Sequence, residues 1–302
     1  MNYYLMFDVG GTKIKAGILT GTGELISGLN SFDSRANRPK EEIFKNFADI
    51  INVLIDQIKD SAKQIAGIGM AFPGPFDYKN GISKMTGLNK YDAIYDCDFK
   101  KELMEMLKKT KALKWFHNDL AFTFIHDVEA FAIGECHYGA ALNCHRVMYL
   151  CIGTGAGSSF TEDGRVLKKQ SDNFPENGWI YKTPFKESII DDYISIRGLL
   201  KISEKYCNRP VEGIDLYEMA VKKEEPALYT LKEFGTNLAE AIVPYLKSFI
   251  PDCLVLGGQV SKSFNFFGSQ LEDYCKEHKI SVRLTEDTSV SILKGLFAEM
   301  QS

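Results

Sequence analysis

The feature that most constrains the fold is a glycine turn that follows an apolar strand near the N-terminus and recurs in the second half of the chain. Residues 3–8 (YYLMFD) and 14–19 (IKAGIL) are expected strands on either side of the turn at Gly10. Residues 146–166 repeat this order of strand, glycine turn and second strand, with Gly153 placed 143 residues after Gly10. Only two copies occur, so the pattern predicts a pair of related domains and not a solenoid.

Strands and helices alternate between the two turns. Residues 41–62 carry apolar residues at a spacing near 3.6, which is typical of an amphipathic helix. Residues 65–72 (IAGIGMAF) indicate a short buried strand that ends at a Pro-Gly-Pro turn, and a strand over 119–127 leads into another helix. The sequence therefore predicts an α/β fold with mixed sheets and flanking helices.

The length of 302 residues suggests two domains, by the rough guide of about 150 residues per domain. We expect a small N-terminal α/β domain over residues 1–118 and a larger C-terminal α/β domain over residues 119–302. A terminal helix over residues 288–302 can pack back on the first domain. In the second domain, residues 190–250 are expected to be mainly helical.

Composition limits the possible classes of protein. No signal peptide and no apolar run of about 18 residues is present, which predicts a cytoplasmic protein with no membrane contact. The 7 cysteines lack CxxC spacing, so neither a disulfide framework nor a zinc knuckle is indicated. The net charge of -4 argues against nucleic acid as a partner, and the basic stretch at 108–114 is interpreted as a solvated helix end.

Glycine turns between antiparallel strands let backbone N–H groups converge on an anion without obstruction by Cβ atoms, which suits the phosphates of a nucleotide. A single turn fits a plain tight hairpin equally well, whereas two turns at matching positions favour phosphate binding. Asp8 is placed to hold magnesium through water. The residues expected to bind the nucleotide in the two turns are Gly10, Gly11, Thr12 and Lys13, and Gly153, Thr154 and Gly155.

Several segments together carry a resemblance to a known family. They are residues 8–13 (DVGGTK), 65–77 (IAGIGMAFPGPFD), 125–135 (IHDVEAFAIGE), 150–164 (LCIGTGAGSSFTEDG) and 253–261 (CLVLGGQVS). In this order and spacing the chain resembles the ROK family of bacterial sugar kinases and related repressors, within the actin-like ATPase superfamily. The resemblance implies two RNase H-like domains over a cleft, with ATP bound by the glycine hairpins and Gly257 and Gly258 near the adenosine.

The resemblance also implies roles for particular side chains. Asp127 lies where the family keeps its catalytic aspartate, which acts as the base for the attacking sugar hydroxyl. On local sequence alone, a helix N-cap explains Asp127 equally well. Gly74 is expected beside the sugar, and so is His126, which replaces the usual asparagine and leaves the sugar preference open.

The largest departure from the family pattern lies between residues 170 and 198. Trp179 replaces a histidine, the cysteine-rich zinc motif is missing, and Asp191 takes the place of a second glutamate. No structural zinc is therefore expected. Glu176 and, less strongly, Asp191 are expected to accept hydrogen bonds from sugar hydroxyls. Trp179 could stack on the sugar, although packing in place of the zinc knuckle is the favoured interpretation.

The resulting hypothesis is an ATP- and Mg²⁺-dependent kinase that phosphorylates a hexose or N-acetylhexosamine, on the 6-OH by family habit. The alternative is a catalytically weak or inactive sugar-binding or sensor protein, whereas a repressor would need a DNA-binding domain ahead of residue 8. The sequence does not fix which sugar is bound. Family resemblance suggests a homodimer, but no apolar stripe identifies an interface.

Overall fold

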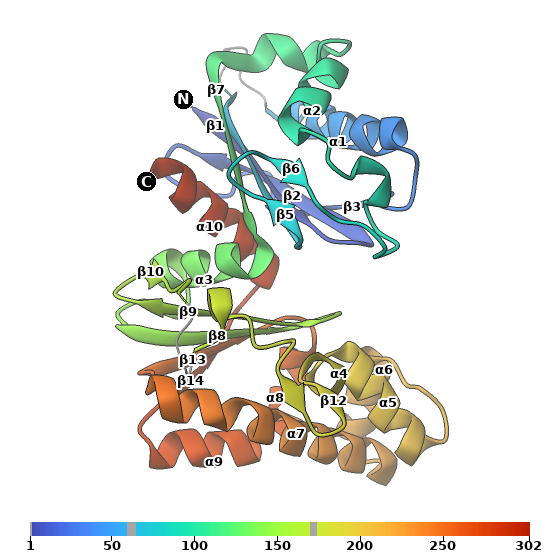
Figure 1. Ribbon diagram of the computed structural model, residues 1–302, viewed down its shortest axis with the longest axis vertical. Coiled ribbons are helices and arrows are strands. Elements are labelled where there is room, and N and C mark those ends of the chain that lie inside the picture. Colours follow the sequence, from blue (N-terminus) through green and yellow to red (C-terminus); the bar gives the residue numbers. More distant parts are fainter. Residues whose placement is uncertain (1, 59–64, 170–173) are drawn as a thin grey trace. The chain divides into compact units, whose positions relative to one another are not determined.

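The computed structural model describes residues 2–58, 65–169 and 174–302, and the chain divides into two compact units (Figure 1). The first unit contains Met1–His137 and Ser289–Ser302, and the second contains Tyr138–Thr288. Each unit is built on a five-stranded sheet.

The first unit has the strand order β3-β2-β1-β4-β7. These strands are β1 (Tyr3–Val9), β2 (Lys13–Thr20), β3 (Asn30–Asp33), β4 (Ile65–Phe72) and β7 (Phe116–His126). The first three form an antiparallel meander, and β4 and β7 then add in parallel to β1. A small hairpin of β5 (Phe76–Asp77) and β6 (Ile82–Ser83) follows β4.

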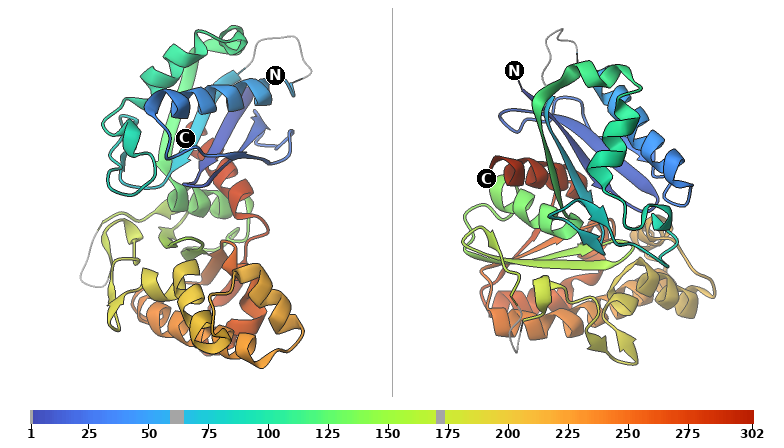
Figure 2. Two further views of the ribbon diagram at one scale, coloured as in Figure 1. Left: turned by 90° about the vertical axis from the view of Figure 1, so that its right-hand side faces the viewer. Right: turned by 45° about the horizontal axis from the view of Figure 1, so that its top comes forward.

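Helices cover both faces of the first sheet (Figure 2). They are α1 (Lys40–Ile55), α2 (Phe99–Leu107), α3 (Asp127–Tyr138) and α10 (Thr288–Gln301), with short 3-10 turns η1 (Asp92–Ile94) and η2 (Lys111–Trp115). The predicted amphipathic helix is confirmed as α1, which buries Phe44, Phe47 and Ile51 in the core. The helix ends at Ile55, so the prediction was wrong for residues 56–58, and its part at residues 59–62 lies outside the described residues.

The side chains of β1 alternate between the two faces of the sheet, as a strand requires. Leu5 and Phe7 join the core that α1 covers. Tyr4 points to the opposite face, where its ring meets the edge of Phe297 in α10 at a centroid distance of 5.1 Å. Asp8 continues this second face, so its carboxylate is brought to the start of α10.

Helices α3 and α10 cross at two glycines. A Cβ atom at Gly134 would lie 1.8 Å from the carbonyl oxygen of Ser291, and one at Gly295 would lie 1.8 Å from that of Ala130. The two backbones are therefore in direct contact, and any larger residue would force them apart. Beside the crossing, the Ser291 hydroxyl donates to Glu135 Oε1 at 2.5 Å.

The second unit has the strand order β10-β9-β8-β13-β14. Its strands are β8 (Arg146–Ile152), β9 (Ala156–Glu162), β10 (Arg165–Val166), β13 (Cys253–Gly257) and β14 (Ser281–Leu284). An antiparallel meander again precedes two parallel strands. The predicted repeat is therefore confirmed at the level of strand order.

The helices of the second unit include the longest in the described residues, α7, whose Phe234 and Ile242 are buried against the sheet. The helical elements are η3 (Glu176–Gly178), α4 (Asp191–Ile194), α5 (Ile196–Cys207), α6 (Gly213–Val221), α7 (Glu225–Phe249), η4 (Val260–Ser263), α8 (Phe264–Phe267) and α9 (Ser269–Glu277). A small hairpin pairs β11 (Pro184–Phe185) with β12 (Ser188–Ile189). Within the described ranges, no helix has both the length and the apolar character needed to cross a membrane.

The chain divides after residue 137 and not at the expected residue 118. The physical reason is that β7 pairs with β4 and belongs to the first sheet. Helix α3 then follows β7 directly and packs against α10 at Gly134. The terminal helix lies in the first unit, because only Thr288 of α10 is assigned to the second.

Replacing Gly295 by alanine tests the helix crossing. Alanine is more favourable than glycine in a helix interior by about 1 kcal/mol. At a helix position with room for a methyl group, the substitution would therefore raise the stability of the protein. We expect Gly295→Ala instead to lower the free energy of unfolding by about 2 to 4 kcal/mol, because the new methyl group meets the Ala130 carbonyl. Urea unfolding measures the change. Gly213→Ala is the control, since a Cβ there has nothing within 4 Å, and equal behaviour of the two variants would contradict the crossing.

Candidate active site

Two side-chain hydroxyl groups hold the first glycine turn by donating hydrogen bonds to its carbonyl groups. The Tyr91 hydroxyl donates to the Gly10 carbonyl at 3.1 Å, and the Ser34 hydroxyl donates to the Gly11 carbonyl at 2.6 Å. Burial raises the pKa of the Tyr91 phenol, so the hydroxyl keeps its proton and remains a donor. The side chains of Thr12 and Lys13 are exposed. The turn is therefore preorganised, and these predicted phosphate-binding side chains face solvent.

Asp8 is a half-buried residue near the end of β1 and is linked to the start of α10. Its Oδ2 accepts a hydrogen bond from the Ser289 hydroxyl at 2.6 Å, and that hydroxyl oxygen accepts one from Lys15 Nζ at 2.9 Å. A carboxylate oxygen is a ligand that Mg²⁺ prefers, and Mg²⁺ in phosphate sites is commonly held by one or two carboxylates with waters and phosphates. Within the described ranges, no three His, Cys, Asp or Glu side chains gather as a metal site. Asp8 thus fits a Mg²⁺ held mainly by phosphate and water.

Asp127 is the first residue of α3, directly after β7. Its Oδ1 accepts a hydrogen bond from the Val128 N–H at 2.8 Å and lies 3.0 Å from His126 Nδ1, which donates to it when protonated. Oδ2 accepts no hydrogen bond from the residues that the structure describes. About one third of the side chain is exposed, at 33%. The helix start therefore uses one carboxylate oxygen, and the second can accept a hydrogen bond from a ligand.

The environment of Asp127 favours its ionised form. Burial alone raises the pKa of the carboxyl group, but the charge of His126 and its hydrogen bond, the Val128 N–H and the charge of Lys90 together lower the pKa below its ordinary value. The carboxylate is therefore charged at neutral pH and can accept a proton or orient a hydroxyl group.

Gly74, Tyr78 and His126 lie together beside Asp127. A Cβ atom at Gly74 would lie 3.6 Å from the Tyr78 hydroxyl and 3.7 Å from His126 Cδ2. The Tyr78 and His126 rings meet edge to face at a centroid distance of 6.0 Å. The sequence predicted Gly74 and His126 but missed Tyr78, because a tyrosine four residues after a Gly-Pro turn carries no periodic or motif signal.

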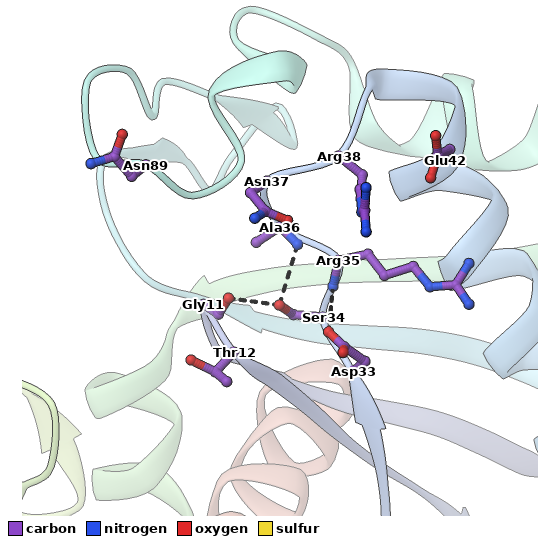
Figure 3. Close-up of a pocket in the computed structure, with 10 residues that line it drawn as sticks. All are labelled: Gly11, Thr12, Asp33, Ser34, Arg35, Ala36, Asn37, Arg38, Glu42 and Asn89. Carbon is purple, nitrogen blue, oxygen red and sulfur yellow. Dashed lines mark hydrogen bonds between the residues drawn. The ribbon is translucent and has the colours of Figure 1, made fainter.

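A pocket of about 670 Å³ opens beside the first glycine turn, and its lining is polar (Figure 3). It is lined by Gly11, Thr12, Asp33, Ser34, Arg35, Ala36, Asn37, Arg38, Glu42 and Asn89. Two arginines and two acids balance the charge of this lining, and the Ser34 hydroxyl ties the loop to the turn. The pocket suits a polar ligand next to the first glycine turn. Sequence reasoning missed Arg35 and Arg38, which lie in a loop without a recognisable motif.

The second glycine turn is fastened by an ion pair of the second unit. Asp191 Oδ1 accepts a hydrogen bond from the Ala156 N–H at 2.6 Å, and Arg197 pairs with Asp191 Oδ2. Arg197 Nη1 also donates to the Thr154 carbonyl at 3.0 Å. Asp191 was expected to bind sugar, but both of its oxygens are engaged in the protein and its side chain is only 12% exposed. Its position supports a structural role at the turn.

The segment that departs from the family pattern is anchored by Ser158. The Ser158 hydroxyl donates to the Gly178 carbonyl at 2.6 Å and accepts from the Ile180 N–H at 2.9 Å. Ile180 and Ile190 are buried in the core, whereas Trp179 is half-buried and Glu176 is exposed. Glu176 therefore remains available to a ligand.

The backbone conformation and close packing at Gly258 require glycine. Its φ is +89°, and a Cβ atom there would lie 2.2 Å from the Ile152 carbonyl oxygen. The Gly258 N–H donates to the Thr288 hydroxyl at 2.8 Å. The ends of β13 and β8 can approach each other because glycine has no Cβ atom and readily adopts a positive φ.

The structure places the predicted site residues in two groups. The first unit holds Asp8, Gly10, Gly11, Thr12, Lys13, Gly74, His126 and Asp127. The second unit holds Gly153, Thr154, Gly155, Glu176, Trp179, Asp191, Gly257 and Gly258. Within the first unit, the glycine turn and the carboxylate of Asp127 share a charged neighbour, Lys90, which the sequence did not single out.

Comparison with known proteins identifies the family. The model of the ROK family matches residues 4–293. The chain therefore belongs to the ROK family, as its motifs predicted.

Relatives in this family include sugar kinases. N-acetyl-D-glucosamine kinase from Photobacterium profundum is 24% identical over 297 residues, covering 92% of this chain and 91% of that protein. Glucokinase from Thermotoga maritima is 21% identical over 277 residues, covering 85% of this chain and 81% of that protein. The crystal structure of a ROK family glucokinase from Streptomyces griseus in complex with glucose and AMPPNP matches with a TM-score of 0.73 at 15% identity, covering 99% of both chains. This likeness confirms the predicted actin-like ATPase fold.

Removing the Asp191 carboxylate separates its two possible roles. We expect Asp191→Ala to lower the free energy of unfolding by about 1 to 3 kcal/mol, because the buried Ala156 N–H loses its hydrogen-bond partner. Thermal and urea unfolding measure the change, with the half-buried neighbour Asp192→Ala as control. If Asp191→Ala keeps full stability and loses only sugar affinity, Asp191 is a sugar ligand and not a support of the turn.

Proposed function

We propose that this protein is an ATP-dependent sugar kinase that transfers the γ-phosphoryl group of ATP to a hydroxyl group of a hexose or N-acetylhexosamine. The observation that carries the proposal is the state of Asp127, an ionised carboxylate with one oxygen fixed at a helix start and the other able to accept a ligand proton. The sugar kinases among its relatives support the substrate class. The 6-OH is the proposed acceptor from family resemblance alone.

In this proposal, Asp127 orients the attacking hydroxyl and takes its proton. Phosphoryl transfer proceeds through a loose transition state, so catalysis depends mainly on positioning and charge stabilisation and needs no strong base. A carboxylate with a lowered pKa is adequate, because the hydroxyl becomes acidic as its bond to phosphorus forms. His126 donates to Oδ1 when Nδ1 is protonated and thereby keeps Oδ2 directed to the ligand.

The two glycine turns are the proposed phosphate-binding elements. Gly10–Lys13 offers backbone N–H groups and the exposed Thr12 hydroxyl and Lys13 ammonium groups, and Gly153–Gly155 is its counterpart in the second unit. Asp8 would hold Mg²⁺ through water, and bound Mg²⁺ would neutralise phosphate charge. Gly257 and Gly258 are proposed to lie near the adenosine.

Sugar recognition is proposed to rest on Gly74, His126 and Glu176, with Trp179 as a stacking surface. Tyr78 supports His126 through its ring, and its hydroxyl is held by the Phe72 carbonyl at 3.0 Å. Because His126 stands where the family usually has asparagine, we propose that it changes which sugar hydroxyl is contacted next to Asp127.

The test is ADP release with Mg-ATP over a panel of hexoses and N-acetylhexosamines. We expect turnover on at least one sugar, and a loss of kcat of about 10² to 10⁴-fold in Asp127→Asn, since the amide cannot accept the hydroxyl proton. Asp119→Asn is the matched control, because Asp119 is an exposed residue of β7, the strand that directly precedes Asp127. Nucleotide binding without turnover on any sugar would favour the sugar-sensor alternative, and full activity of Asp127→Asn would exclude this residue as the base.

A further inference from the structure

Lys90 lies across the first glycine turn, in the loop that leads from β6 to η1. A Cβ atom at Gly11 would lie 3.1 Å from Lys90 Cδ and 3.7 Å from Lys90 Cβ, so the aliphatic part of Lys90 covers the bare backbone of Gly11. The side chain is half-buried. This is the conformation of a lysine that packs its methylene groups on the protein and extends its ammonium group beyond them.

The backbone on both sides of Lys90 is fixed. On one side, Asp92 Oδ2 accepts a hydrogen bond from the Asn89 N–H at 3.1 Å. On the other, the fully buried Tyr91 donates its N–H to the Ala36 carbonyl at 2.6 Å and its hydroxyl to Gly10. The loop and the glycine turn are thus joined through the residue next to Lys90. Lys90 is held at the turn by the structure and is not a freely moving surface lysine.

Carboxylates lie on both sides of the segment that holds Lys90 and Tyr91. Its ammonium group acts on the carboxylate of Asp127 and contributes to the lowered pKa of that group. Asp8 and Asp33 act on the adjacent Tyr91. Within the part of the chain that the structure describes, Lys90 forms no ion pair with any of these carboxylates. The ammonium group therefore remains available to an anion that binds between the turn and Asp127.

A γ-phosphoryl group brought next to the base would be repelled by the ionised carboxylate of Asp127, and a cation at this position offsets the repulsion. We propose that Lys90 is a further catalytic residue, whose ammonium group contacts the γ-phosphoryl group of ATP while that group passes to the hydroxyl held by Asp127. The proposal rests on the proposed kinase function. In it, Lys90 neither gains nor loses a proton; it neutralises charge on the phosphoryl oxygens while the bond to the β-phosphate breaks and the bond to the sugar oxygen forms.

The substitution Lys90→Met tests this role, since it keeps the aliphatic cover of Gly11 and removes the charge. We expect kcat to fall by about 10²-fold, as for the loss of one group that stabilises transition-state charge, with little change in the KM for sugar. Lys90→Arg should restore much of the activity. Lys79→Met, an exposed lysine in the β5–β6 turn of the same unit, is the matched control and should behave as wild type.

Two further readouts separate a charge effect from a structural one. Lys90 lowers the pKa of Asp127, so its removal raises that pKa and should move the acidic limb of kcat/KM to higher pH. Lys90→Met should also weaken binding of the non-hydrolysable analogue AMPPNP by about tenfold while leaving ADP binding nearly unchanged, because ADP lacks the γ-phosphoryl group. Urea unfolding should show no loss of stability.

The outcomes also distinguish this proposal from the kinase assignment. Absence of turnover in the wild type would contradict the proposed function, yet the ratio of AMPPNP to ADP affinity would still test the contact of Lys90. An unchanged ratio together with an unchanged kcat would overturn the proposal. Equal weakening of both nucleotides with reduced stability would overturn it as well, because Lys90 would then act only through the structure of the turn.

Discussion

The close crossing of α3 and α10 is the constraint on which the first unit depends. Gly134 and Gly295 let the two helix backbones touch, and this contact fixes the direction of both helices. The first residue of α3 is Asp127, and Ser289 near the start of α10 donates to Asp8. One packing contact therefore positions both acidic residues of the proposed site, although neither acid takes part in it.

In the second unit, an ion pair and its hydrogen bonds hold the glycine turn in place. Asp191 and Arg197 hold the second glycine turn through the Ala156 N–H and the Thr154 carbonyl. This pair follows the segment in which the family pattern of histidine and cysteines is missing. The Asp191 side chain is only 12% exposed, whereas that of Arg197 is 54% exposed, so the pair specifies local geometry more than it adds stability. The sequence predicts Asp191 as a sugar ligand, and in the structure both of its carboxylate oxygens contact groups of the second unit.

The sequence predicted the parts of the structure that depend on local signals. The repeat of strand, glycine turn and strand was visible because apolar runs on either side of a glycine turn indicate a hairpin, and the structure has these hairpins as β1–β2 and β8–β9. The hydrogen bond from the Ala156 N–H to Asp191 was not predictable, because the two residues lie 35 positions apart in sequence. The contacts of Tyr91 and Lys90 with the first glycine turn were not predictable either. Both residues lie about 80 positions after the turn in sequence, and neither belongs to a recognisable motif. The glycines of the α3–α10 crossing carried no signal for the same reason.

The most direct test of the account is a crystal structure of the protein with AMPPNP, Mg²⁺ and a sugar that supports turnover or binds. We expect the triphosphate to lie against Gly10–Lys13, with the γ-phosphoryl group beside Lys90. We also expect a sugar hydroxyl within about 2.6 to 3.2 Å of Asp127 Oδ2, as is usual for a base and its substrate. A nucleotide bound away from the glycine turns, or a γ-phosphoryl group facing a hydroxyl held by another carboxylate, would contradict the account.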